Sequence, residues 1–252
     1  MAVVTVPWSL VAVANLRVYP HLPWSIPAAL GYLAAIAWYL NGHGWPPSTT
    51  ETRRRHFRAR VPGPAEAAWS LSAGSLAIVS LWLIFAATGR FASQPAPGQE
   101  ALLPPHVLLA FVIVGALVAA TGEEAGIRGF MQAPLERRFG PWVAIAVSAT
   151  AFVLIHFTRG AAALLANGLF YFSAGVVYGL LAYLTQSILP SLLLHFLGDV
   201  ATLAVRSSLL RVSGPDTMLG IAFCVLGALV TAGLSVAAFR ALARNAVYHP
   251  LE

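Results

Sequence analysis

The sequence predicts an all-α protein of about eight transmembrane helices, folded as a single transmembrane domain over residues 1–252. Two observations lead to this prediction. Of the 252 residues, 58% are hydrophobic and only 10% are charged, whereas roughly a quarter are charged in an average soluble domain. The apolar residues also gather in successive runs, and one bilayer crossing needs about 20 of them. A chain of this length leaves no room for a separate soluble domain.

Each expected helix is an apolar run bounded by residues that break helices. In chain order the runs cover residues 3–16, 22–40, 67–88, 105–122, 141–157, 163–186, 190–205 and 217–239. Turn residues separate them at Tyr19–Pro23, Gly44–Pro47, Pro95–Pro105, Gly140–Pro141 and Leu189–Pro190. After residue 122 an amphipathic segment, Phe130–Phe139, extends the helix toward the turn at Gly140. Pro134 lies within this extension, where proline kinks or breaks a helix.

The charges indicate how the chain is oriented and exclude a nucleic-acid partner. The net charge is +6, but the arginines lie between apolar runs and form no continuous basic face. The polar stretch 41–66 holds Arg53, Arg54, Arg55, Arg58 and Arg60. The positive-inside rule places this stretch in the cytoplasm, and counting crossings from it places both termini there. All 15 cationic side chains are arginine, which favours a GC-rich bacterial source and thus the plasma (inner) membrane.

Ionisable side chains inside apolar helices are costly, by about 2.5–3.5 kcal/mol for a central charge, so they need a partner or a function. This chain concentrates them in three motifs, which are Glu123-Glu124-Ala125-Gly126-Ile127-Arg128, Phe152 to His156, and His195 to Asp199. Glu124 and Arg128 are four residues apart and can form an ion pair on one helix face. His195 and Asp199 are also four residues apart, so both groups can point to one spot. Phe152 shares a face with His156 and is expected to shield the site.

The distances along the chain place Glu123 and His156 at one level. Glu123 lies 17 residues before Gly140 and His156 lies 16 residues after it. At about 1.5 Å per residue, both are about 25 Å from the turn between two antiparallel helices. His195 meets them if the turn protrudes into the cytoplasm. We therefore expect one site, within the bilayer and nearer the cytoplasmic face.

A carboxylate and two imidazoles in a dry pocket suit peptide hydrolysis, which needs an activated water and an oxyanion-stabilising group. Glu123 with His156 would activate the water, and His195 with Asp199 would stabilise the oxyanion. The alternative is a divalent metal such as zinc, held by Glu123, His156 and His195. There is no HExxH pair, and the spacing does not decide between metal-dependent and metal-free activation.

At these motifs the chain resembles the CPBP family, which includes the CAAX prenyl endoproteases and bacterial relatives linked to bacteriocin processing and self-immunity. Its EExxxR pattern matches Glu123, Glu124 and Arg128, its FxxxH pattern Phe152 and His156, and its HxxxN/D pattern His195 and Asp199. The resemblance implies that the helices over 105–206 are catalytic, and that Glu123 and His156 activate water, His195 and Asp199 form the oxyanion site, and Glu124 with Arg128 supports them. Many prenyl endoproteases have asparagine where this chain has Asp199.

The expected function is therefore an intramembrane endopeptidase acting on a membrane-anchored protein or peptide. For a bacterial source, maturation of a secreted peptide or trimming of a C-terminal sorting tail is favoured over prenyl-type C-terminal cleavage. Two other classes stay open: a proton-coupled transporter, since buried Glu, His and Asp also form proton relays, and a non-catalytic immunity or scaffold protein. In the run 163–186, Asn167, Tyr171 and Tyr178, together with its glycines, could line a substrate groove. Glycine is also the usual means of close helix packing, and we favour that interpretation.

Overall fold

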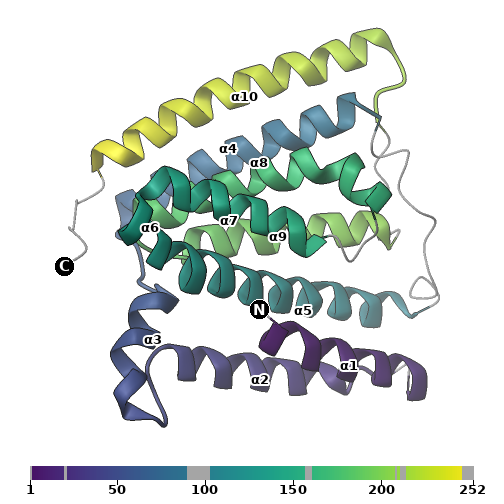
Figure 1. The fold of residues 1–252 in the computed structure, drawn as a ribbon. Helices are drawn as coiled ribbons and strands as arrows, with labels where there is room; N and C mark the ends of the chain where they lie inside the picture. The colour runs from purple at the N-terminus through teal and green to yellow at the C-terminus, as the bar shows by residue number, and fades with distance from the viewer. Residues whose placement is uncertain are drawn as a thin grey trace.

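The computed structural model describes residues 2–19, 22–89, 103–156, 161–207, 209–210 and 214–245. Over these ranges the chain forms a bundle of helices and no strand (Figure 1), which confirms the all-α prediction. The helices are α1 (Ala2–Val18), α2 (Ser25–Leu40), η1 (Pro47–Thr49), α3 (Thr50–Phe57), α4 (Pro64–Ala87), α5 (Pro105–Glu123), η3 (Glu124–Gln132), α6 (Ala133–Phe139), α7 (Pro141–Ile155), α8 (Ala161–Thr185), α9 (Leu189–Arg206) and α10 (Met218–Asn245).

The helices coincide with the apolar runs of the sequence. Five stretches are long and apolar enough to cross a membrane, namely Pro64–Ala87, Pro105–Phe139, Asn167–Thr185, Leu189–Arg206 and Met218–Asn245. Three shorter apolar helices, Val6–Val18, Ser25–Leu40 and Pro141–Ile155, correspond to the remaining runs. The prediction of a polytopic transmembrane protein is therefore confirmed.

One continuous helix of 35 residues, Pro105–Phe139, forms the centre of the bundle. At about 1.5 Å per residue it is roughly 50 Å long, well beyond the ~30 Å hydrocarbon core, so one end extends past the membrane. Pro134 does not break it. It lies in the first turn of α6, directly after the π-helix η3, where the wide turn ends. π-Helices form i→i+5 hydrogen bonds, are rare, and frequently occur at functional sites.

The neighbours of this helix define the layers of the bundle. α1 and α2 pack on one side of α5, and α7, α8 and α9 lie on the other (Figure 1). α10 forms the outermost layer and packs along α4. Glycines allow α8 to approach α7 and η3 closely, because a Cβ at Gly175 would lie 3.0 Å from the Ala149 Cα and one at Gly179 would lie 3.0 Å from the Gln132 Oε1. The close-packing interpretation of these glycines is confirmed.

The short helix α3, within the polar stretch 41–66, was not predicted. Its Arg53 is buried and donates hydrogen bonds to the carbonyl oxygens of Tyr39, His43 and Pro46, with the guanidinium 4.2 Å from the centre of the Tyr39 ring. This arginine is therefore part of the packing between α2 and α3, in addition to any influence on membrane orientation.

α3 approaches the π-helix most closely at Gly129, and this contact gives a first prediction. A Cβ at Gly129 would lie 2.5 Å from the backbone oxygen of His56, a distance that requires the backbone to move. We expect Gly129→Ala to lower the thermal unfolding temperature. Gly233→Ala in α10 is the matched control, because nothing lies within 4 Å of its Cβ position, and alanine favours a helix over glycine. Equal unfolding temperatures for the two variants would contradict this packing.

His56 makes the same junction sensitive to pH. Its Nε2 lies 2.9 Å from the Arg137 guanidinium, so the neutral ring accepts that hydrogen bond. Partial burial, followed by the charges of Arg137, Arg58 and Arg55, lowers the pKa of His56 below its ordinary value of 6.5. The stability contributed by neutral His56 is thus fully present above pH 6.5 and is lost as the pH falls toward the lowered pKa.

We therefore expect the thermal stability of the wild type to fall more steeply between pH 7.5 and pH 5.5 than that of His56→Gln. Glutamine keeps a hydrogen-bond acceptor and does not titrate. Unfolding temperatures of both proteins across this range provide the test. Parallel pH profiles would mean that His56 does not contribute to the acid sensitivity.

Candidate active site

Four helices bring the three sequence motifs to one place. Glu123 is the last residue of α5, and Glu124 and Arg128 lie in η3. His156 directly follows α7 as its C-cap residue, and its backbone N–H donates to the carbonyl oxygens of Val153 and Leu154. His195 and Asp199 lie one turn apart on α9, which packs along α5. α8 lies between α7 and α9 and supplies aromatic side chains to the same region.

His195 is the centre of the cluster. Its Nδ1 is 2.9 Å from the Glu124 Oε1, and its Nε2 is 3.7 Å from the Glu123 Oε2 and 3.6 Å from the Asp199 Oδ2. The ring is 3% exposed and stacks on Tyr178, with ring centres 5.0 Å apart. One imidazole therefore faces three carboxylates, with Glu124 on one nitrogen and the other two on the second.

Glu124 is also held by Arg128. Both side chains are completely buried, and the Glu124 Oε1 is 3.0 Å from the Arg128 guanidinium. That guanidinium donates a second hydrogen bond to the Gly175 carbonyl and lies 4.7 Å from the centre of the Phe152 ring. The absence of a side chain at Gly175 leaves this carbonyl accessible. Arg128 thus fixes the carboxylate that in turn fixes His195.

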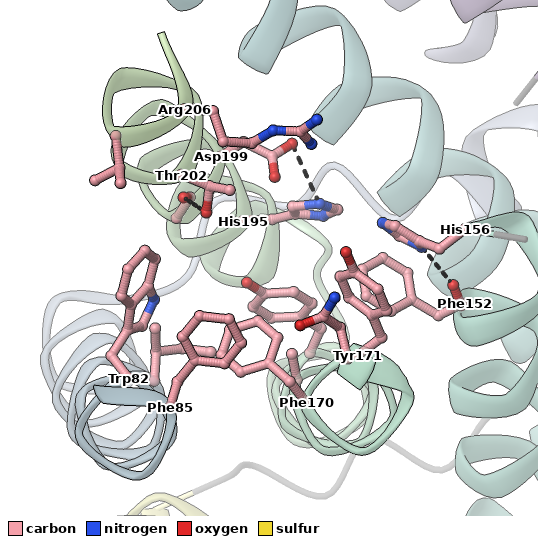
Figure 2. A pocket seen from close by; sticks show the side chains of 16 residues that line it. Trp82, Phe85, Phe152, His156, Phe170, Tyr171, His195, Asp199, Thr202 and Arg206 are labelled. Atoms are coloured by element: carbon pink, nitrogen blue, oxygen red, sulfur yellow. Dashed lines mark hydrogen bonds and ion pairs between the residues drawn. The ribbon is translucent and has the colours of Figure 1, made fainter. Parts of the chain in front are cut away.

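His156 is held by its own helix. Its Nδ1 is 2.7 Å from the Phe152 carbonyl oxygen, and because a carbonyl only accepts, Nδ1 carries the hydrogen. Figure 2 shows the other ring nitrogen turned toward His195. The His156 ring stacks on Tyr171, with centres 4.0 Å apart. The buried Phe152 ring meets His156 and His195 edge-on, at 4.9 and 5.3 Å.

A cavity of about 200 Å³ opens beside these groups (Figure 2). His156, His195 and Asp199 form its polar wall, and Trp82, Phe85 and Phe170 form much of the opposite, aromatic wall. Figure 2 shows the Arg206 side chain reaching across the rim on the side of Asp199. Glu123 is 15% exposed and lies beyond His195, outside the set of lining residues. The cavity is thus apolar at one end and polar at the other.

Comparison with known proteins identifies the segment that carries this site. Residues 105–201 match the model of a family described as type II CAAX prenyl endopeptidase, Rce1-like. These residues resemble the CAAX protease family. The predicted resemblance is thereby confirmed, and with several apolar helices the protein is an integral membrane protein. No curated protein and no solved structure matches the chain.

The matched segment contains every site residue expected from the sequence, but the contribution of α4 was not expected. α4, which precedes the matched segment, supplies Trp82 and Phe85 to the cavity. Asn167, Tyr171 and Tyr178 also line it, which agrees with the substrate-groove alternative and not with the favoured packing interpretation for these three side chains. Tyr171 and Tyr178 are seven residues apart, which places both on one face of α8.

Metal binding at the cluster would depend on the spacing of its side chains and on their ring nitrogens. Among the described residues, no group of three or more His, Cys, Asp or Glu side chains can hold a metal ion. The Nδ1 atoms of His195 and His156 are engaged by the Glu124 carboxylate and the Phe152 carbonyl, so either ring would bind water or a metal ion through Nε2. The zinc set considered from the sequence, Glu123, His156 and His195, would use these Nε2 atoms.

Proposed function

We propose that the protein is an intramembrane endopeptidase that hydrolyses a peptide bond of a membrane-anchored protein or peptide with water activated by Glu123 and His156. The observation that carries the proposal is the geometry of His195. Glu124 holds one of its nitrogens, and the other faces the carboxylates of Glu123 and Asp199 beside an aromatic cavity.

The lack of a hydrogen bond at the Glu123 Oε2 supports its role as the general base. Within the described structure its buried Oε2 has no hydrogen-bond partner, although buried acceptors are normally paired. His156 carries its hydrogen on Nδ1, so Nε2 of the neutral ring is an acceptor. A water molecule has two hydrogens, and Glu123 and His156 would each accept one. The oxygen lone pair would then point at the carbonyl carbon of the substrate.

The remaining polar groups suit the oxyanion. As an imidazolium, His195 would donate from Nδ1 to Glu124 and from Nε2 to the developing oxyanion. Asp199 would have to be protonated to donate as well, because an ionised carboxylate repels an oxyanion. Glu123 takes a proton from water as the C–O bond forms and passes it to the leaving amine as the C–N bond breaks. The proton count then balances over one turnover.

The cavity supports a substrate with an apolar residue next to the cut bond. Trp82, Phe85 and Phe170 would bury such a side chain, at about 25 cal/mol per Å² of apolar surface. The catalytic helices would be those over 105–206, with α4 as the wall of the specificity pocket. Suitable reactions are C-terminal processing and peptide maturation.

The arginines support a location in the plasma (inner) membrane of a bacterium with both termini in the cytoplasm. α3, α6 and the C-terminal end of α10 lie at the same end of the bundle (Figure 1). These elements and the adjoining residue 60 carry Arg53, Arg54, Arg55, Arg60, Arg137, Arg138, Arg240 and Arg244. Such an excess is typical of the cytoplasmic side.

The test compares the membrane proteomes of cells that carry the wild type, Glu123→Ala, His156→Ala or the control Glu51→Ala, whose carboxylate is exposed. We expect the same precursors to keep their uncut ends with the first two variants and to be processed with the control. Unchanged processing in all four strains would overturn the proposal. Proton-driven flux in vesicles would then support the transporter alternative.

We propose that the reaction needs no metal, because no three His, Cys, Asp or Glu side chains among the described residues are grouped so that they could hold an ion. Treatment of the purified enzyme with a strong zinc chelator is expected to leave the cleavage rate within about twofold of the untreated rate. Elemental analysis of the same sample should give well under one metal ion per chain. Loss of activity on chelation that is restored by added zinc would show a metal-dependent enzyme instead.

A further inference from the structure

A second hollow, of about 390 Å³, lies at the end of the bundle that carries α3 and is distinct from the candidate active site. The hollow lies between the chain around α3, the end of α6 and the turn between α8 and α9. Its charged lining consists of five arginines and no acidic residue: Arg54, Arg55, Arg58, Arg60 and Arg137.

Two of these arginines are fixed by carboxylates outside the lining. Arg58 and Glu136 form a buried ion pair, and Arg58 also donates to the Gln186 side chain. Arg60 is paired with Glu66. These pairs hold the wall of the hollow in place without neutralising the other three guanidinium groups.

The other three arginines have little negative charge near them. Arg54 donates to the Asn41 carbonyl and Arg137 contacts the neutral His56, and among the described residues no carboxylate pairs with either. Arg55 lies 4.0 Å from Glu51, with both side chains more than half exposed, where such a pair contributes little. The hollow therefore carries an uncompensated positive charge.

We propose that Arg54, Arg55 and Arg137 form a binding site for a phosphate group, with the headgroup of an anionic phospholipid as its source. Guanidinium groups match phosphate oxygens with paired hydrogen bonds. The hollow lies where a helix longer than the membrane leaves it, which is the level of lipid headgroups. Arg54 and Arg137, together with the exposed Arg55, supply the charge. Arg58 and Arg60, fixed by their carboxylates, supply the shape of the wall.

The test uses the purified full-length protein and two triple variants. Arg54→Gln/Arg55→Gln/Arg137→Gln removes the site, and Arg138→Gln/Arg240→Gln/Arg244→Gln removes the same charge from exposed positions at the same end. Binding of phosphatidylglycerol, phosphatidylcholine and inorganic phosphate is measured by native mass spectrometry and by the shift in unfolding temperature.

We expect phosphatidylglycerol to bind in preference to phosphatidylcholine, and its affinity to fall about 10- to 100-fold in the first variant but much less in the control. If the wild type binds inorganic phosphate but not phosphatidylglycerol, and the first variant loses that binding, the phosphate site stands and the lipid is excluded as its source. Equal loss in both variants, or none in either, would overturn the site.

A second measurement needs no variant and covers the case in which the first one fails to fold. His56 contacts Arg137 at the edge of the hollow, and the surrounding arginines help to lower its pKa. A bound phosphate group would offset that charge. The pKa of His56, followed by NMR, is expected to rise on addition of phosphatidylglycerol or phosphate and to stay unchanged with phosphatidylcholine. An unchanged pKa with all three would contradict the proposal.

Discussion

Glu123→Gln is expected to reduce the rate of peptide cleavage by about 10²- to 10⁴-fold, the range attributed to a general base. Glutamine has the same shape but cannot take a proton from water. The fold should be unaffected, because the Oε2 of Glu123 has no hydrogen bond to lose within the described residues. The measurement is the initial rate on an identified substrate in nanodiscs, together with the unfolding temperature.

The control is Glu51→Gln, which also replaces a carboxylate by an amide but at an exposed position of α3. Its rate should equal that of the wild type. A stable Glu123→Gln protein that cleaves at the wild-type rate would exclude Glu123 as the base and leave His156 as the remaining candidate.

Glu124→Gln is expected to lower the free energy of unfolding by about 3–5 kcal/mol, the cost of leaving one partner of a buried ion pair alone. Arg128 is completely buried and would keep its charge without a counter-charge. Chemical or thermal unfolding in the same detergent provides the measurement. A loss below about 1 kcal/mol would mean that water or another group reaches Arg128.

The double variant Glu124→Leu/Arg128→Leu separates stability from positioning. Replacing both members of a buried pair by apolar residues often restores stability. The His195 Nδ1 would nevertheless lose its acceptor, so we expect kcat to stay low while KM changes little. Recovery of both stability and kcat would show that Glu124 and Arg128 serve the fold alone.

The sequence predicted the helices and the three motifs because both depend on local patterns. Apolar runs with proline and glycine at their ends specify membrane helices directly. The pairing of Glu124 with Arg128 also follows from a spacing within one helix. Each of these inferences uses residues that lie close together in the chain.

The contact between Glu124 and His195 could not be predicted from local patterns in the sequence. It joins residues of η3 and α9 that are far apart in the chain, and it depends on how closely α5 and α9 pack. The cavity wall on α4 was missed for a similar reason, since Trp82 and Phe85 are ordinary apolar residues of a membrane helix. α3 lacks apolar periodicity. It is held by the hydrogen bonds that Arg53 donates to the surrounding backbone carbonyl oxygens.

The π-helix η3 sets the rotation of one half of the central helix relative to the other. Removing one residue from an α-helix turns everything beyond it by about 100°. In this chain the half before η3 directs Glu123 toward α9, and the half after it directs Glu136 toward Arg58 beyond α3. A deletion of one residue within Glu124–Gln132 would therefore leave a continuous helix. Its two halves could no longer make the contact of Glu123 with α9 and the ion pair of Glu136 with Arg58 at the same time.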